Sequence, residues 1–322
     1  LHVRSRRQRQ MCIRDRLLVV MVIGKKVLSI QSHVVHGYVG NKAASFPLQC
    51  KGWDVDALNT VQFSNHPAYG FISGFKSNSD DLESIIEDGL VGGLKMKYNA
   101  VLTGYLPDTE GLRKIGTVVR KMCEDDRDLK WLLDPVLGDD GKLYVPEATV
   151  AIYEQILRDG SVFLATPNQF ELEILTGLRI FDLASLKSTM KRFHELYPKV
   201  CYLVVTSVDF ESDNFVSTCT DFTDYWYFTV PRIKAHFSGS GDLFSAILMD
   251  LLLSSKDENV DLPLALNKAL SLVDEVLQRT YDLTLKPTQE PEQPFRINDL
   301  KIIQCKDLFR NVYVAKFKCN KL

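Results

Sequence analysis

The chain has 322 residues, of which 45% are apolar and 25% charged, proportions typical of a globular protein with one large or two ordinary domains. Its formal net charge of −2 gives no reason to expect nucleic acid or a membrane surface as a partner. Seven scattered cysteines without a CxxC pair indicate reduced thiols in a cytoplasmic protein, and no apolar stretch is long enough to span a bilayer.

The first residues differ in composition from the rest. Six arginines and one acidic residue, Asp15, stand within positions 1–16. A transit peptide or signal-peptide n-region would carry such charge, but the run from Arg9 to Arg16 resembles translated sequencing adapter. We therefore interpret residues 1–20 as a non-native or disordered extension, Met21 as a candidate native start, and residues 21–322 as a single domain.

Strand-like and helical patterns alternate along the rest of the chain. Periodicity predicts helices over 109–123 and 146–157, helical spacing over 183–193, and a long helix starting at Asp261. Strands are expected at 27–30, 55–63, 100–106, 130–136, 161–165, 200–205, 300–305 and 312–317, with a β-hairpin within 215–230. Strands separated by helices indicate an α/β fold, with a mostly parallel sheet covered by helices on both faces.

Polar side chains follow several of these strands. In a parallel sheet the ligand lies outside the carboxyl ends of the strands, so these residues should converge on one cleft together with the glycine-rich turn at 239–242. They are Ser32, Tyr105, Asp134, Asn168 and Ser207.

The most informative motif is Gly239-Ser240-Gly241-Asp242, directly before the apolar run Leu243 to Leu253. Backbone N–H groups at the start of a helix can hold an anion, and a carboxylate beside them can accept the proton of an alcohol. Phosphoryl transfer to a hydroxyl needs both. The alternative is an ordinary turn in which Asp242 caps the helix. The apolar run predicts a buried helix, which favours a site.

Further acidic residues suit metal and phosphate binding. Asp134 and Asp139 could hold Mg²⁺ directly or through water, or could be solvated acids of a capped turn. Asn168 and Glu171 could reach phosphate and metal-bound water, form a capping box, or do both. His33 and His36 lie three positions apart in a loop, where a structural role is favoured over metal binding.

Six blocks of sequence occur in a fixed order along the chain. They run from Leu28 to Asn41, Val61 to His66, Leu102 to Tyr105, Asp134 to Asp139, Thr166 to Glu171 and Gly239 to Asp242. Together, in this order, they resemble the signatures of pyridoxal kinases in the ribokinase-like superfamily. The resemblance extends from Lys26 to the last strand and implies the ribokinase-like α/β fold.

This resemblance implies ATP-dependent phosphorylation of the 5′-hydroxyl of pyridoxal, pyridoxine or pyridoxamine. Asp242 would be the general base, and Gly239, Ser240 and Gly241 would supply the anion hole. Residues expected at the vitamer are Ser32, Val39, Phe63, His66 and Tyr105.

The resemblance also implies ATP, Mg²⁺ and a monovalent cation, K⁺ or Na⁺, and a homodimer. Residues expected at ATP are Asp134, Asn168, Ser207, Ser240 and Tyr144, the last in a lid over 138–146. Residues expected near the cations are Asp134, Asp139, Glu171, Thr166 and Thr206.

Two departures and two rival functions remain. Pro67 stands where many members carry Thr, and the lid is shorter than in animal members. A hydroxymethylpyrimidine or sugar kinase of the same fold is one rival, although hydroxymethylpyrimidine kinases often have Cys where this chain has Asp242. A B6-binding protein without turnover is the other.

Overall fold

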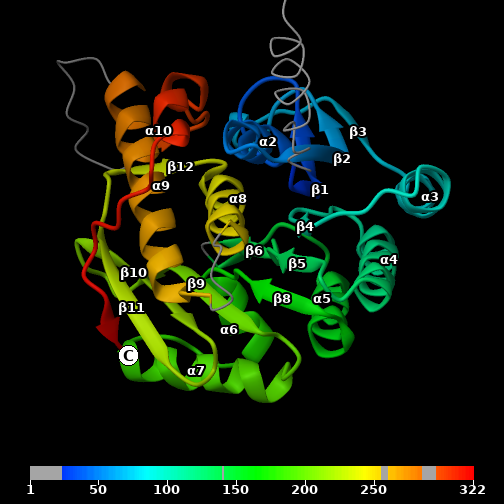
Figure 1. Cartoon of the computed structure of the whole chain (residues 1–322). Helices are drawn as coiled ribbons and strands as arrows, with labels where there is room; N and C mark the ends of the chain where they lie inside the picture. The colour runs from blue at the N-terminus through cyan, green and yellow to red at the C-terminus, as the bar shows by residue number, and fades with distance from the viewer. Residues whose placement is uncertain (1–23, 140, 255–259, 285–294) are drawn as a thin grey trace, which may run out of the picture.

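A ten-stranded sheet, ordered β14-β11-β10-β9-β8-β5-β4-β1-β2-β3, forms the centre of the molecule (Figure 1). The computed structural model describes residues 24–139, 141–254, 260–284 and 295–322. The strands are β1 (Lys26–Val34), β2 (Asp54–Phe63), β3 (Gly74–Lys76), β4 (Ala100–Thr103), β5 (Lys130–Leu133), β8 (Val162–Ala165), β9 (Tyr202–Asp209), β10 (Asn214–Thr220), β11 (Tyr225–Pro231) and β14 (Asn320–Lys321). Two short pairs lie outside it: β6 (Gly138–Asp139) with β7 (Lys142–Leu143), and β12 (Ala235–Phe237) with β13 (Phe295–Ile297).

The centre of the sheet is parallel and its ends are antiparallel. Strands β2, β1, β4, β5, β8 and β9 pair in parallel. Strand β3 is antiparallel to β2, while β10, β11 and β14 continue antiparallel beyond β9. The predicted α/β fold with a mostly parallel sheet is therefore confirmed, and the predicted hairpin is β10–β11.

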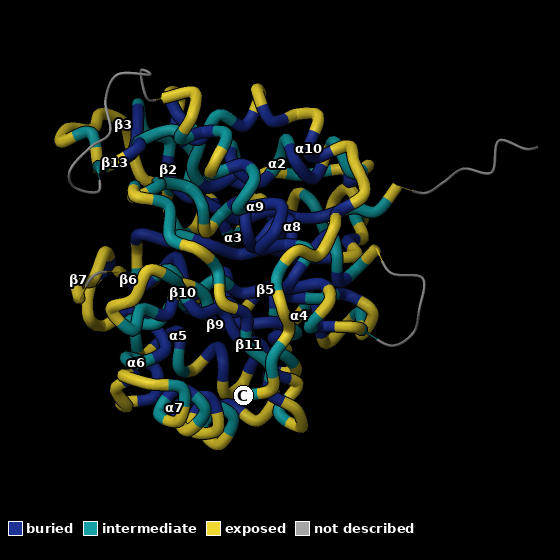
Figure 2. Tube along the Cα trace, turned by 90° about the vertical axis from the view of Figure 1, so that its left-hand side faces the viewer, coloured by how far each residue is buried: buried dark blue, intermediate teal, exposed yellow. Residues whose placement is uncertain are grey.

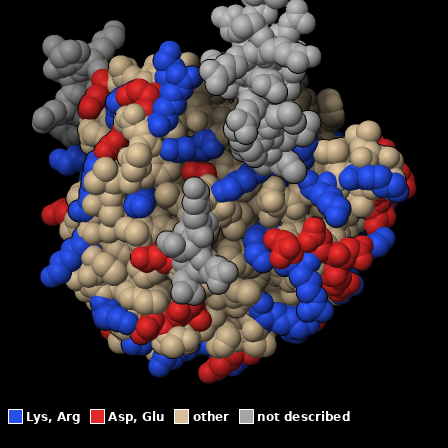
Figure 3. Space-filling view, in the orientation of Figure 1, with Lys and Arg blue, Asp and Glu red and all other residues tan. Residues whose placement is uncertain are grey.

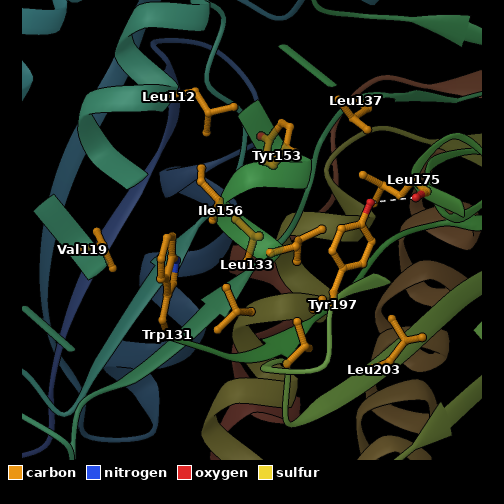
Figure 4. Close-up of a cluster of buried hydrophobic side chains, with 14 of the residues drawn as sticks. Leu112, Val119, Trp131, Leu133, Leu137, Tyr153, Ile156, Leu175, Tyr197 and Leu203 are labelled. Carbon is orange, nitrogen blue, oxygen red and sulfur yellow. Dashed lines mark hydrogen bonds between the residues drawn. The ribbon is translucent and has the colours of Figure 1, made fainter. Parts of the chain in front are cut away.

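Helices cover both faces of the sheet. One face packs against α3 (Ser79–Ser84), the π-helical segment η2 (Ile85–Gly93), α4 (Thr109–Asp125), α5 (Ala148–Asp159), α6 (Gln169–Thr176) and α7 (Leu183–Leu196). The other packs against α2 (Asn41–Cys50), α8 (Ser240–Leu253), α9 (Leu262–Thr284) and α10 (Lys306–Arg310). Figure 4 shows part of the first apolar cluster, in which the buried Tyr197 hydroxyl donates to the Leu175 carbonyl at 2.8 Å.

Helix α8 is the most enclosed helix of the second face. Its apolar side chains leave it no solvated face, and it packs between α2 and α9, so it is mostly dark blue in Figure 2. Asp250, a buried residue of α8, accepts the indole N–H of Trp53 at 2.9 Å. This bond gives the buried carboxylate a hydrogen-bond partner. This burial fixes where the first turn of α8, with Asp242, meets the sheet.

The expected strands at 300–305 and 312–317 are wrong. Residues 303–305 form the short 3₁₀ turn η3 (Ile303–Cys305), and 312–317 run along α9 without a strand partner. The Lys316 N–H donates to the Ser271 hydroxyl at 2.9 Å, and the Phe317 N–H donates to the Asn267 side chain at 3.0 Å. Side chains of a helix, not a neighbouring strand, satisfy this extended backbone.

Helices α2 and α3–η2 were not expected. Helix α2 starts after Gly40 and contains Pro47, two residues that usually mark turns, and η2 contains three glycines. Burial of Ala43, Ala44 and Leu48 outweighs the local cost of the proline.

Two further expectations concern the surface and the ends. The interpretation of residues 1–20 lies outside the described residues. Among the residues that are described, no helix is both long and apolar enough to cross a bilayer. On the face drawn in Figure 3, Lys and Arg side chains are interspersed with Asp and Glu side chains, in keeping with the near-zero net charge.

Candidate active site

The carboxyl ends of neighbouring strands place most of the expected residues side by side. The Asp134 N–H donates to the Thr103 carbonyl at 2.9 Å, and the Thr166 N–H donates to the Leu133 carbonyl at 3.1 Å. One strand further, Asn168 and Thr206 form an isolated parallel bridge. Ser32 differs from the expectation, because it lies inside β1 at a register shift and not after the strand.

Asp242 does not cap its own helix. The N-cap of α8 is Gly239, with a φ of 84° and no side-chain capping bond, and the Asp242 carboxylate accepts the Gly40 N–H at 2.7 Å. The capping alternative is therefore wrong. The first N–H groups of a helix have no partner within it, so those of Ser240 and Gly241 are oriented to bind an anion beside this carboxylate.

Two glycines allow the β1–α2 loop to touch the turn. A Cβ on Gly239 would lie 2.1 Å from the Tyr38 carbonyl oxygen and 3.4 Å from the Val39 Cα. A Cβ on Gly40, where φ is 53°, would lie 2.3 Å from the Ser32 hydroxyl oxygen. Only glycine fits either position. The first contact places Tyr38 and Val39 against the turn at 239–242, and the second places Ser32 against Gly40.

Asp134 faces the same turn from β5. Its Oδ2 accepts the Ser245 hydroxyl at 3.1 Å, and an added Cβ on Gly241 would lie 4.0 Å from that oxygen. Burial, together with the negative charge of Asp242, raises the pKa of Asp134 to about 7. Burial raises the pKa of Asp242 to about 6, partly offset by the Gly40 N–H. Both carboxyl groups therefore have pKa values closer to neutrality than a free aspartate.

Asn168 and Glu171 form the expected capping box at the start of α6. The Asn168 amide also donates to the Gly138 carbonyl at 2.8 Å, while the Glu171 carboxylate accepts N–H groups of Leu137 at 2.9 Å and Gly138 at 3.4 Å. Burial raises the pKa of Glu171 well above its usual value. The pair therefore fixes the base of the β6–β7 hairpin, which carries Asp139 at its exposed end and the exposed Tyr144 just beyond.

The residues expected at the vitamer lie around the β1–α2 loop and the end of β2. Phe63 ends β2, its carbonyl accepts the Val35 N–H at 2.8 Å, and His66 is buried. Tyr105 is half-buried after β4, and burial raises its pKa. Pro67 starts the turn η1 (Pro67–Tyr69) and is exposed.

The oxygen-rich edge suits hard cations. Carboxylates of Asp134 and Asp242 and the hydroxyls of Thr166 and Ser245 gather there, the last two 3.4 Å apart. In the described part of the chain no three acidic, His or Cys side chains converge as a ready metal site. Mg²⁺ usually binds through one or two carboxylates together with phosphate oxygens and several water molecules.

Sequence reasoning missed Ser245. Its hydroxyl joins Asp134 to Thr166, and it is buried in α8 three positions after Asp242. A lone serine inside an otherwise apolar helix was the available signal. Ser207, an expected ATP contact, is exposed with a φ of 57°, a conformation uncommon for a non-glycine residue.

We predict that Asp242→Asn stabilises the protein at neutral pH. A folded pKa of about 6, above an unfolded value of about 3.9, means that stability falls as pH rises through this interval. The Asn variant lacks this loss. Urea midpoints measured from pH 4.5 to 7.5 should therefore separate progressively, with the variant higher above pH 6. A constant difference across this range would contradict the raised pKa.

Known proteins resemble this chain over most of its length. The family model for phosphomethylpyrimidine kinase matches residues 82–291. A putative pyridoxal kinase of Saccharomyces cerevisiae is 49% identical over 294 residues, covering 89% of this chain and 93% of that protein. The pyridoxal kinase of Homo sapiens is 36% identical over 300 residues, covering 87% of this chain and 94% of its own length.

Solved structures agree with the fold. Pyridoxal kinase from Leishmania donovani in complex with ADP and pyridoxine has 31% sequence identity and a TM-score of 0.77, covering 92% of this chain and 99% of that chain. Pyridoxal kinase from Entamoeba histolytica has a TM-score of 0.80 at 24% identity, over 93% of this chain and 100% of its own, and supports the fold alone. Similarity of this extent means that the chain belongs to the pyridoxal kinases of the ribokinase-like superfamily.

Proposed function

We propose that this enzyme transfers the γ-phosphoryl group of ATP to the 5′-hydroxyl of a B6 vitamer with Asp242 as the general base. One observation carries the assignment of the base. The Asp242 carboxylate lies in the first turn of a buried helix, held by the Gly40 N–H at 2.7 Å, beside helix N–H groups suited to phosphate. The names of relatives, and the ADP and pyridoxine in the Leishmania donovani complex, support the substrate class.

Asp242 would take the proton of the 5′-hydroxyl as the oxygen attacks phosphorus. Its pKa of about 6 leaves it ionised at neutral pH, yet basic enough to accept a proton. The N–H groups of Ser240 and Gly241 would hold the charge that develops on the transferring phosphoryl group. The vitamer would lie against Ser32, Val39, Phe63, His66 and Tyr105.

The ATP phosphates would lie along the β5, β8 and β9 ends, near Asp134, Asn168, Thr206 and Ser207. Mg²⁺, held through Asp134 and water with contributions from Asp139 and Glu171, would neutralise phosphate charge. A monovalent K⁺ or Na⁺ would lie near Thr166 and Thr206. The oxygen donors at this edge support these cations, because buried carboxylates with raised pKa values favour a nearby positive charge.

The β6–β7 hairpin with Tyr144 would close over ATP and exclude water, which would otherwise accept the phosphoryl group. Its base is fixed by Asn168 and Glu171, so closure would involve the exposed end of the hairpin.

We further propose a cytoplasmic homodimer. Six described cysteines are free thiols, as expected in a reducing compartment. Phe75, in the edge strand β3, is 64% exposed, and Phe71, in the segment just before β3, is 70% exposed, which supports association through this edge. Sedimentation equilibrium should give twice the chain mass, and Phe75→Glu should weaken the dimer more than Phe181→Glu, a substitution of another exposed phenylalanine. A monomeric wild type would contradict the proposal.

We predict that Asp242→Ala lowers kcat by about 10²–10⁴-fold, the usual contribution of a general base. The assay is formation of pyridoxal 5′-phosphate from pyridoxal, MgATP and K⁺, followed by absorbance. Asp182→Ala is a matched control, since that carboxylate accepts the Ser185 N–H at 2.7 Å but only caps α7. The control should lose helix stability and keep its turnover.

Other outcomes separate the rivals. Near-wild-type turnover by Asp242→Ala would remove Asp242 as the base. Transfer to hydroxymethylpyrimidine or a sugar, without transfer to pyridoxal, would reassign the substrate within the same fold. Binding of pyridoxal without any product would favour the non-catalytic B6-binding protein.

We predict that Gly239→Ala lowers kcat by about 10²-fold or more, because its Cβ would lie 2.1 Å from the Tyr38 carbonyl oxygen and displace the turn. Gly177→Ala is the control: its φ is 71°, close to the 84° of Gly239, but nothing lies within 4 Å of the added Cβ. It should be destabilised by backbone strain and remain active. Equal activity losses in both variants would show that strain, not the contact with Tyr38, is responsible.

A further inference from the structure

Residues 298–299 lie where a late segment of the chain meets the expected vitamer loops. They follow β13, which pairs in parallel with β12, and the Ser238 N–H donates to the Ile297 carbonyl at 3.2 Å. Because Ser238 immediately precedes Gly239, this segment is bonded directly to the strand that leads into the catalytic turn.

Asp299 contacts three residues on the side where the vitamer is expected, one in η1 and two in the β1–α2 loop. Its Oδ2 accepts the Tyr69 hydroxyl and lies 3.5 Å from Nε2 of His36. Its Oδ1 would lie 2.2 Å from a Cβ on Gly37, which has a φ of 96°. The carboxylate therefore rests directly on the backbone of the β1–α2 loop while it holds the side chain that ends η1.

Asn298 holds His66 through its backbone. Nε2 of His66 lies 2.7 Å from the Asn298 carbonyl oxygen, which can only accept, so Nε2 carries the proton. In the neutral ring Nδ1 is then an acceptor on the opposite edge. The His66 ring also meets the Tyr69 ring edge-on, with centroids 5.1 Å apart.

Stability alone does not account for this arrangement. The Asp299 side chain is 18% exposed, and its Oδ1 is buried without a hydrogen-bond partner among the described residues. Such an oxygen is costly to bury. His36 is 73% exposed, so its attraction to Asp299 is screened by water and contributes little. The Tyr69 pKa is raised to about 12, by burial and by Asp299, so its hydroxyl remains a donor at neutral pH.

We propose that Asn298 and Asp299 are positioning residues for the vitamer: together they fix His66, Tyr69 and the loop at Gly37 relative to the catalytic turn. This rests on the assignment above of the β1–α2 loop and His66 to the vitamer pocket. The loop is then held at three points, by Asp299 at Gly37, by Gly239 at Tyr38 and by Asp242 at Gly40. The described contacts of Asp299 do not involve β5, β8 or β9, the strands at whose ends the ATP phosphates are proposed to lie.

The test is steady-state kinetics of Asp299→Ala, Tyr69→Phe and the double variant, in the full-length enzyme. Loss of a hydrogen bond to a charged group predicts a rise of about 10-fold in KM for pyridoxal, with KM for ATP within about 2-fold. The double variant should be no worse than Asp299→Ala, because both changes remove one interaction. Asp299→Asn, which keeps an acceptor for Tyr69, should recover most of the loss.

Asp307→Ala is the control, since Asp307 is a carboxylate of the same C-terminal segment and pairs with Arg279 at 2.5 Å. It should leave both KM values unchanged. Equal changes in both KM values, or a loss in kcat alone, would overturn the positioning role. If Asp299→Ala unfolds, Tyr69→Phe alone must show the same selective rise in KM. The general-base assignment is tested independently by Asp242→Ala, because that variant is expected to change kcat, whereas Asp299→Ala is expected to change KM for pyridoxal.

Discussion

The site depends on one hydrogen bond, from the Gly40 N–H to the Asp242 carboxylate, which joins positions 202 residues apart in the sequence. It connects the loop after the first strand to the first turn of the most enclosed helix. The sheet order makes this contact available, because β1 lies between β4 and β2, and α8 packs on the same face of the sheet as α2. Without this bond, a carboxylate at the start of α8 would have no fixed direction relative to the β1–α2 loop.

The same region gathers three carboxyl groups whose ionised forms burial disfavours. Glu171 is buried, Asp134 and Asp242 are half-buried, and burial is the main cause of the raised pKa of all three. Such charges are unfavourable in the free protein. In the proposed reaction, a cation that arrives with ATP would stabilise the ionised forms of these carboxyl groups. Catalytic sites commonly hold groups in such states.

Much of the site could be predicted from the sequence because its residues follow a general rule. Asp134, Asn168 and Thr206 stand at the carboxyl ends of adjacent parallel strands, and the turn before α8 has a recognisable glycine pattern. Ser245 was missed because one serine in an apolar helix carries no motif. The contacts of residues 298–299 were missed for a different reason: the Asn298 carbonyl meets His66 across 232 positions, and a backbone acceptor leaves no trace in the sequence.

The fold could be predicted where apolar residues recur at the regular spacing of a strand or a helix, and less well where they do not. The central strands and α4, α5 and α9 follow such patterns, whereas α2 contains a proline and residues 312–317 imitate a strand while bonding to α9. Local patterns report which side chains are buried. They do not report whether a strand or a helix side chain satisfies the backbone.

The bonds from Asn168 and Glu171 to the β6–β7 hairpin reach only Leu137 and Gly138, at its base. A longer hairpin would keep these bonds at its base, and the entropic cost of a longer loop grows only slowly with its length. Relatives can differ in the reach of this hairpin while the start of α6 remains the same.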